Sequence, residues 1–196
     1  MRPAHVACVV MFLAVFADAA VGAATSVGVF FDADATDCDH AVELFTPFSV
    51  YVVATLGADA AADGITGARF RVDGLSDIVR SVTPNAAASV LLGDPTGGDG
   101  AIAFGSCTSG QGPQNAVLLY TIVCSPLASV SPRVVAVRRS LTPCDACHLF
   151  APVVTFCDAN YTGLYVAGGE ARINSGACTV STHPVAWSAV KSMFRS

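Results

Sequence analysis

The sequence has little charge and almost no lysine. Asp, Glu, Lys and Arg make up 13% of its 196 residues, and Lys191 is the only lysine. Globular proteins average about 25% charged residues. A coiled coil or a long solvated helix needs dense glutamate and lysine, so this composition excludes both. It also excludes intrinsic disorder, because 53% of the residues are hydrophobic and supply ample apolar surface to bury.

Long apolar runs and an excess of basic residues are also missing. The mean hydropathy is +0.59, but the apolar residues fall in short runs, so we expect no transmembrane helix. The net charge of −5 at pH 7 argues against a nucleic-acid partner, which requires a basic face. Arg133, Arg138 and Arg139 form the only basic cluster, which we interpret as a solvated strand end.

Residues 1–23 have the pattern of a secretory signal peptide. Arg2 supplies the positive charge, residues 6–17 form a short apolar core, and Val21-Gly22-Ala23 offers the small residues that a signal peptidase reads. The sequence therefore predicts cleavage near Ala23 and a secreted or periplasmic protein.

The rest of the chain has the period-two pattern of β-strands. In Ala68–Asp73, small or apolar residues alternate with Arg69, Arg71 and Asp73, which indicates a half-buried antiparallel strand. Nine further strands are predicted: Ser26–Phe31, Ser49–Leu56, Ser89–Leu92, Ala101–Phe104, Ala116–Cys124, Arg133–Arg138, Val153–Cys157, Leu164–Ala167 and Glu170–Asn174. Gly168-Gly169 is predicted as a two-residue hairpin turn. These features predict an all-β fold, a single antiparallel β-sandwich of about nine to ten strands.

The segment at 183–196 breaks the strand pattern. Trp187, Val190 and Phe194 recur with helical spacing after Pro184, a residue that suits a first helical turn. We expect a short C-terminal helix that covers an open part of the sandwich. The predicted organisation is thus a signal peptide at 1–23, a sandwich domain at 24–182 and a helical tail at 183–196.

The strand order resembles a known family. The resemblance rests on five segments: Ser26–Phe31, Pro47–Leu56, Gly64–Val72, Ala101–Phe104 and Val117–Val123. Together they resemble the cohesin-type jelly-roll sandwich, with its Val-x-Val strand and its Gly-hydrophobic-x-Gly-Ala-x-Phe strand. The C-terminal residues 187–195 resemble the end of a set of uncharacterised secreted bacterial proteins. The resemblance implies a binding module with its partner surface on a sheet face, and the cysteine clusters depart from it.

Seven cysteines remain after the predicted cleavage. Cys124 lies among apolar residues on one face of its strand, so we expect a buried free thiol there. The others are predicted to form disulfides, because a secreted chain matures in an oxidising compartment: Cys38, Cys107, Cys144, Cys147, Cys157 and Cys178. We predict Cys38 with Cys107 and favour Cys157 with Cys178. Cys144 then pairs with Cys147, unless these four cysteines exchange partners.

Residues 144–148 match the c-type haem attachment pattern, with Cys144, Cys147 and His148. Met193, His40 or His183 would have to supply the second axial ligand. The β-rich surroundings and the competing cysteines argue against haem, so we expect none. A zinc site made of Cys144, Cys147, His148 and Cys157 is the other metal alternative.

An acidic loop at residues 32–43 invites a calcium interpretation. The possible ligands follow the spacing of an EF-hand loop in part: Asp32, Asp34, Asp37, Asp39 and Glu43. The sixth position is Asp37 where an EF-hand has glycine, and strand-like segments flank the loop. A plain loop capped by aspartates is therefore favoured, with a calcium site as the alternative.

Three function classes remain open. The preferred one is a secreted non-catalytic module that binds an extracellular protein or a polysaccharide, with Val117, Leu119 and Val123 as candidates for an exposed apolar face. The second is a secreted hydrolase that uses aspartates of the 32–39 loop. The third is a small outer-membrane β-barrel, against which the cysteines and the outward charges of Ala68–Asp73 argue.

Overall fold

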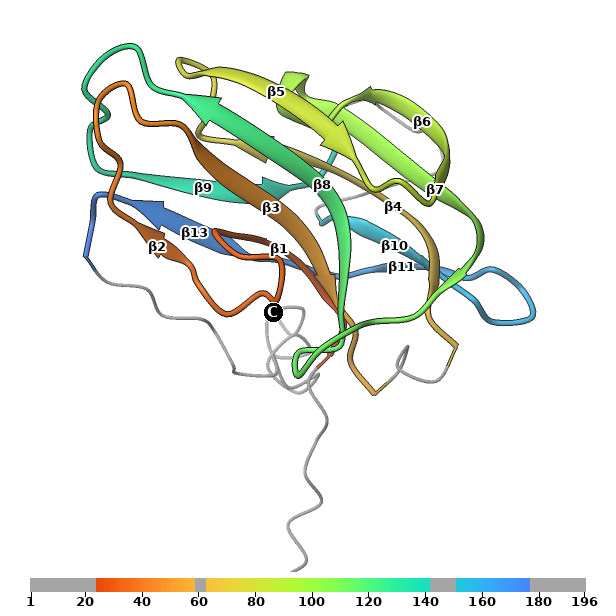
Figure 1. The fold of residues 1–196 in the computed structure, drawn as a ribbon. Helices are drawn as coiled ribbons and strands as arrows, with labels where there is room; N and C mark the ends of the chain where they lie inside the picture. The colour runs from red at the N-terminus through yellow and green to blue at the C-terminus, as the bar shows by residue number, and fades with distance from the viewer. Residues whose placement is uncertain (1–23, 59–62, 142–150, 177–196) are drawn as a thin grey trace, which may run out of the picture.

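The computed structural model describes residues 24–58, 63–141 and 151–176, which form two β-sheets packed face to face (Figure 1). The smaller sheet has the order β12 (Ala167–Gly168), β1 (Ser26–Phe30), β3 (Phe48–Thr55), β8 (Ala116–Ser125) and β5 (Val79–Pro84). The predicted all-β sandwich is thereby confirmed. Residues 183–196, where we expect a helix, lie outside the described residues.

The larger sheet carries the remaining strands. Its main path is β11 (Gly163–Tyr165), β10 (Val153–Phe156), β4 (Ile65–Asp73), β9 (Arg133–Arg138), β13 (Glu170–Ile173) and β2 (Asp39–His40). Off this path, β7 (Asp99–Thr108) pairs with β4, and β6 (Ala88–Asp94) pairs with β7. A 3-10 turn, η1 (Pro95–Gly97), links β6 to β7. In the described ranges, no helix is both long and apolar enough to cross a membrane.

The core lies between the two sheets. Val50 and Val52 of β3, Ile122 of β8 and Phe70 of β4 are fully buried, as the alternation along these strands requires. The ring of Phe70 meets the ring of Tyr120 edge-on, with centroids 5.9 Å apart. This pair joins β4 of the larger sheet to β8 of the smaller one, and edge-on contact is a favoured arrangement for aromatic rings.

The predicted hairpin at Gly168-Gly169 is wrong. β11 pairs with β10, β12 with β1 and β13 with β9, so the two glycines lie where the chain crosses from one sheet to the other. The N–H of Gly169 donates to the oxygen of Val27 at 2.8 Å, and its oxygen accepts from the N–H of Val137 at 3.0 Å. A Cβ on Gly168 would overlap the oxygen of Val137. Glycine is needed here for close approach between strands and not for a turn.

β5 has no counterpart among the predicted strands. Among the described strands it is an edge strand that pairs only with β8, and each of its residues is half-buried or exposed. The buried alternation that identifies a strand in sequence is therefore missing. Pro84 ends the strand, and proline is tolerated at such an edge because its missing N–H leaves no ladder bond unmade.

Candidate functional site

The outer face of the larger sheet brings five strands together in one row. Leu92 of β6 lies opposite Ala101 of β7, which lies opposite Arg69 of β4. Arg69 lies opposite Val153 of β10, and Val153 lies opposite Tyr165 of β11. Directly opposed residues in antiparallel strands share a face. Leu92 and Tyr165, at the two ends of the row, are 65% and 57% exposed.

A second row runs beside the first. Its members are small or apolar and are paired in the same way: Val90, Ala103, Gly67, Thr155 and Gly163. We call the ten residues of these two rows the platform. Several inner positions carry small residues, namely Ala101, Ala103 and Gly67, and Arg69 lies among them. Val90 at the β6 edge is 51% exposed. The platform has aliphatic side chains at one edge, small residues around Arg69 in the middle, and a tyrosine at the other edge.

Arg69 is held on the platform by a bidentate ion pair. Its Nε and Nη2 donate to the two carboxylate oxygens of Asp99 at 3.2 and 3.1 Å. The hydroxyl of Ser140 donates to the same carboxylate. A guanidinium held by two parallel hydrogen bonds loses little further entropy on binding, because its position is already set.

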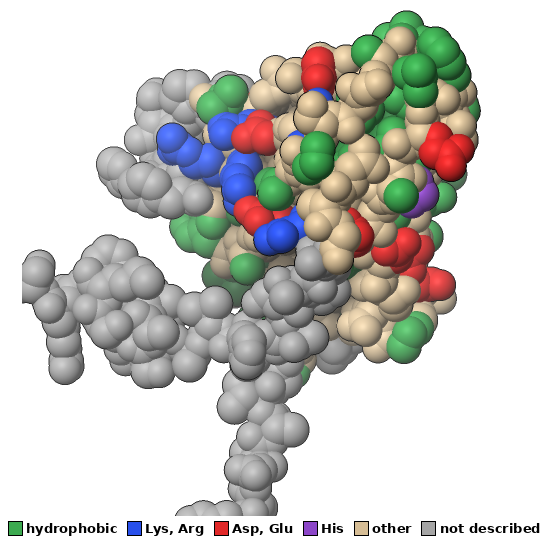
Figure 2. Space-filling view, turned by 90° about the vertical axis from the view of Figure 1, so that its left-hand side faces the viewer, with side chains coloured by type: hydrophobic (Ala, Val, Ile, Leu, Met, Phe, Trp, Pro, Cys, Tyr) green, Lys and Arg blue, Asp and Glu red, His purple; other side chains and the backbone are tan. Residues whose placement is uncertain are grey.

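Beyond the platform, the same face carries alternating charges. Arg71 of β4 lies opposite Arg138 of β9. Arg71 pairs with Asp73 at 2.9 Å, and Arg138 pairs with Glu170 at 2.6 Å. Figure 2 shows basic side chains gathered on one side of the molecule with acidic side chains between them. The face is therefore part apolar and part charged, with both signs present.

The apolar face expected on β8 is not formed. Val117 and Leu119 are buried, and only Val123 of the three candidates is exposed. The register of β3 and β8 shifts between Val52 and Val53, which are paired with Tyr120 and Leu118. Leu119 is thus the extra residue of a β-bulge, and a bulge re-aims the neighbouring side chains. This bulge allows Leu119 and Tyr120 both to be buried.

The acidic loop is organised by capping hydrogen bonds. Asp32 accepts hydrogen bonds from the backbone N–H groups of Thr36 and Asp37, each at 2.9 Å, and from the Thr36 hydroxyl. Burial alone would raise the pKa of Asp32, but these hydrogen bonds outweigh it and hold the pKa below its usual value. Asp37 likewise accepts from the N–H of Asp39 at 3.2 Å.

The structure does not gather the other predicted calcium ligands. Across the ranges that the structure describes, no group of three or more His, Cys, Asp or Glu side chains is placed to hold a metal ion. This statement covers Asp32, Asp34, Asp37, Asp39 and Glu43. The haem and zinc hypotheses depend on residues 144–148, which lie outside the described residues.

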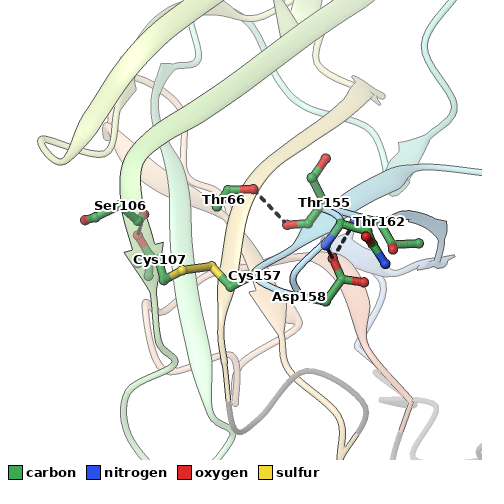
Figure 3. Close-up of a disulfide and its surroundings, with 9 residues drawn as sticks. Thr66, Ser106, Cys107, Thr155, Cys157, Asp158 and Thr162 are labelled. Atoms are coloured by element: carbon green, nitrogen blue, oxygen red, sulfur yellow. Dashed lines mark hydrogen bonds between the residues drawn. A yellow bond between two sulfur atoms is a disulfide. The ribbon is translucent and has the colours of Figure 1, made fainter.

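Two of the predicted cysteine pairings are wrong. Cys107, near the end of β7, is bonded to Cys157, just after β10, with the Cα atoms 5.7 Å apart (Figure 3). This disulfide excludes Cys38–Cys107 and Cys157–Cys178. Cys38 is also disulfide-bonded. The positions of Cys144, Cys147 and Cys178 lie outside them as well.

The register explains why Cys107 meets Cys157. Thr108 of β7 and Phe156 of β10 both lie opposite Ile65, the first residue of β4. Beyond the start of β4, no strand separates β7 from β10, so their ends converge. The N–H of Cys157 donates to the oxygen of Gly64 at 3.1 Å, which fixes the position of the bridge.

Cys124 is free and fully buried on β8. Burial raises the pKa of its thiol to about 11, although the positive charge of Arg80 on the neighbouring strand opposes this rise. A thiol with so high a pKa is a poor nucleophile at neutral pH, because the thiolate is the reactive form. Cys124 is therefore a core residue and not a reactive site.

The Cys124 thiol makes a pH-dependent contribution to stability. Its ordinary pKa is 9.0 and its pKa in the folded protein is about 11, so the folded state holds the proton more tightly. The contribution is complete below pH 9 and is lost as the pH rises through 11. Between pH 8 and 10, the free energy of unfolding of wild type, measured with urea, should fall by about 1 kcal/mol relative to that of Cys124→Ala. A difference that stays constant over this range would contradict the prediction.

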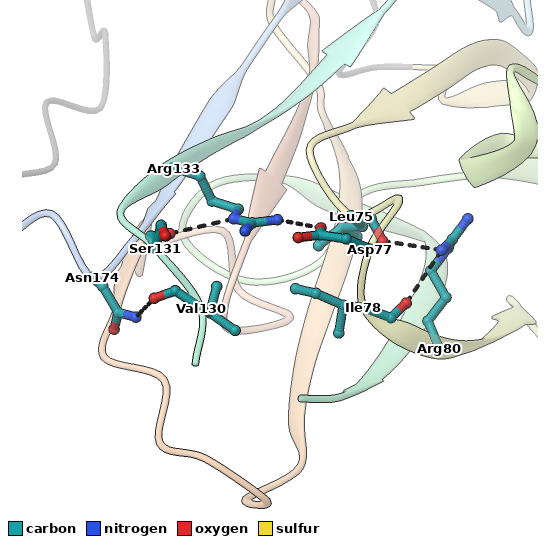
Figure 4. A network of polar contacts seen from close by, with 8 residues as sticks. All are labelled: Leu75, Asp77, Ile78, Arg80, Val130, Ser131, Arg133 and Asn174. Carbon is teal, nitrogen blue, oxygen red and sulfur yellow. Dashed lines mark hydrogen bonds and ion pairs between the residues drawn. The ribbon is translucent and has the colours of Figure 1, made fainter. Parts of the chain in front are cut away.

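The predicted basic cluster is divided between the two ends of β9. Arg133, at the start of the strand, forms an ion pair with Asp77 in the β4–β5 loop, and this contact lowers the pKa of Asp77 (Figure 4). Arg80 holds the same loop by donating to the oxygen of Leu75 at 3.0 Å. Arg133 therefore supports the fold, whereas Arg138 lies at the far end of β9, on the charged part of the outer face.

Comparison with known proteins identifies the fold of this chain. No protein-family model and no curated protein sequence matches the chain. It is similar in structure to the cohesin module of a family 33 glycoside hydrolase from Clostridium perfringens, with 10% identity over 78% of this chain and 98% of that chain, at a TM-score of 0.51.

Two further solved structures are more distant. One is a type I cohesin–dockerin complex from Clostridium thermocellum, with 10% identity over 76% of this chain and 99% of that chain, at a TM-score of 0.44. The other is a type I cohesin from Pseudobacteroides cellulosolvens, with 10% identity over 82% and 97%, at a TM-score of 0.43. The likeness to the Clostridium perfringens module, together with the two-sheet strand order, shows that this protein has the cohesin-like β-sandwich fold.

Proposed function

We propose that this protein is a secreted, non-catalytic module that binds a protein partner through the platform on the larger sheet. The observation that carries the proposal is the exposure of Val90, Leu92 and Tyr165 at the edges of a surface whose middle carries small residues and Arg69. Removing exposed apolar side chains from water lowers the free energy, so a partner that covers them is bound favourably. The fold agrees with this proposal, since the cohesin-type domains that it resembles are binding modules.

The composition of the platform favours a protein partner over a polysaccharide. Tyrosine and arginine are enriched in protein–protein interfaces and lysine is depleted. Here Tyr165 lies at the edge opposite the aliphatic one, and a pre-positioned Arg69 lies between the two edges. A standard interface uses about 20–30 residues on each side. The platform therefore forms its apolar centre, and the charged residues around Arg71 and Arg138 form part of its rim.

The hydrolase alternative lacks support at the acidic loop. A glycosidase acid needs a raised pKa so that it stays protonated near neutral pH. The hydrogen bonds on Asp32 hold its pKa below the ordinary value instead. Its oxygens are also engaged with Thr36 and Asp37. The loop is therefore better suited to supporting β1 and β2 than to proton transfer.

Secretion is supported by two independent features. Residues 1–23 have the signal-peptide pattern. Cys107 and Cys157 form a disulfide between two strands, and such bonds persist in oxidising compartments. We infer that the protein acts outside the cytoplasm after cleavage near Ala23.

The platform can be tested with a matched pair of variants. Leu92 and Leu127 are both 65% exposed, but only Leu92 belongs to the platform. Leu92→Asp should weaken partner binding at least tenfold, by roughly 1.4 kcal/mol or more, because it places a charge in the apolar centre. Leu127→Asp should leave binding unchanged.

The measurement uses the wild-type protein, immobilised, with the secreted and surface proteins of its source organism. Proteins retained by wild type are identified by mass spectrometry, and the affinity of each purified partner is then measured for all three forms. The proposal is wrong if Leu92→Asp binds these partners as tightly as wild type, or if Leu127→Asp loses them equally.

A further inference from the structure

Strand β6 leaves one edge of the larger sheet open. Among the strands that the structure describes, β6 pairs only with β7 (Figure 1), so its outward backbone N–H and C=O groups have no strand beside them. Every residue of β6 after Ala88 is exposed. Val90, Leu91 and Leu92 are consecutive apolar residues and are 51%, 46% and 65% exposed. Exposed apolar residues on an unpaired edge are the pattern that recruits a further strand.

The other described edges of the two sheets are poorly suited to pairing. β2 and β12 have two residues each and β11 has three, so they offer few backbone groups. β5 carries Arg80 and ends at Pro84, and both charge and proline discourage pairing at an edge. β6 has seven residues and no charge before Asp94. A β-bulge near its start leaves residues 90–92 in regular register.

The sequence of β6 is complementary to itself when two copies run antiparallel. A two-fold axis at Leu91 places Val90 of one copy opposite Leu92 of the other, so apolar side chains meet apolar side chains. Asp94 then lies opposite Ala88, and no like charges meet at the seam, although each chain has a net charge of −5. A parallel arrangement would bring two Asp94 side chains together, which disfavours it.

We propose that two copies of this protein pair through β6 and form a dimer with a continuous larger sheet. Two-fold pairing uses the open edge of both copies, so the assembly closes at two chains. The match of apolar with apolar residues, and of Asp94 with a neutral residue, favours a second copy over a strand from another protein. Burial of the apolar side chains and pairing of the backbone groups stabilise the dimer.

This inference goes beyond the proposed function. Leu91 lies opposite Ile102, which is buried, so it faces away from the platform that Val90 and Leu92 help to form. Substitutions at Leu91 therefore test the dimer without changing a platform residue. On the other face of the sheet, the dimer would place the aliphatic edges of two platforms side by side.

The test measures self-association of the purified protein by analytical ultracentrifugation, for wild type and for charged variants at Leu91. Leu91→Lys places two positive charges opposite each other at the axis, and Leu91→Glu places two negative charges there. Each variant should weaken dimerisation at least tenfold. An equimolar mixture of the two variants places a lysine opposite a glutamate and should restore the dimer. Rescue by the mixture separates loss of pairing from loss of folding, because two misfolded chains would not restore each other.

Leu164→Lys is the matched control. Leu164 is 43% exposed and lies on β11, at the far edge of the same sheet, where it pairs with the buried Val154. This variant should dimerise as wild type does. In wild type, backbone N–H groups of residues 88–94 should also exchange with solvent more slowly as the protein concentration rises.

Four outcomes would overturn the proposal. They are a wild type that stays monomeric at about 1 mM, assemblies larger than a dimer, a mixture of the two charged variants that stays monomeric, and a Leu164→Lys variant that loses the dimer as Leu91→Lys does. A monomeric wild type would leave the platform proposal standing, because that proposal is tested at Leu92 with a different partner.

Discussion

A Phe70→Ala variant is expected to unfold with a free energy about 3–5 kcal/mol lower than that of wild type. Phe70 is fully buried, and its ring meets Tyr120 across the two sheets. Alanine would leave a cavity between the sheets, because β4 is held by neighbouring strands and cannot collapse into it. Most domains have only about 5–15 kcal/mol of stability, so the loss should be easily measured by urea denaturation.

Phe45 supplies the matched control. It is 69% exposed, so Phe45→Ala removes the same atoms from solvent-facing surface and should change the free energy of unfolding by less than about 0.5 kcal/mol. If Phe70→Ala were no more destabilising than Phe45→Ala, the ring would not occupy the core position described here.

Removal of the Cys107–Cys157 disulfide should have the second largest effect. The bond closes a loop with a sequence separation of 50. Because it restrains the unfolded chain, such a bond stabilises the folded state by about 2–4 kcal/mol. A Cys107→Ala/Cys157→Ala double variant should therefore unfold at lower urea concentration under non-reducing conditions. Replacing both cysteines avoids leaving an unpaired thiol that could react with Cys38 or its partner.

Peptide mapping without reductant provides the independent check. A peptide that joins Cys107 to Cys157 is expected. A peptide that joins Cys107 to Cys38 would contradict the convergence of β7 and β10 beyond the start of β4.

Local patterns predicted most of the strands, because local burial dictates them. Arg133–Arg138 has the same bounds in the structure, and Ala116–Cys124 differs by one residue. Alternation along β4 also placed Phe70 in the core and Arg69 outside it. In each case, the periodicity arises from one buried face and can be recognised without knowing the neighbouring strand.

The predictions that were wrong concern features that depend on which strands lie side by side. Gly168-Gly169 looks like a turn in sequence, but β12 joins β1 in one sheet while β13 joins β9 in the other. The partners of Cys107 and Cys157 depend on the convergence of β7 and β10. The platform likewise arises from residues far apart in the chain, such as Leu92 and Val153. The run of consecutive apolar residues at 90–92 was its only signal in the sequence.

The register of β1 has a consequence for how the protein is made. Ser26 pairs with Ala167 and Val27 with Gly168. One edge of β1 therefore cannot pair until β12, near the C-terminal end of the chain, has been synthesised. At about 5–20 residues per second, roughly 7–28 s of synthesis separate these partners. Until then, β1 presents an unpaired apolar edge, which is an aggregation hazard for a nascent chain. The smaller sheet is therefore completed only late in synthesis, and this edge of β1 stays open during that interval.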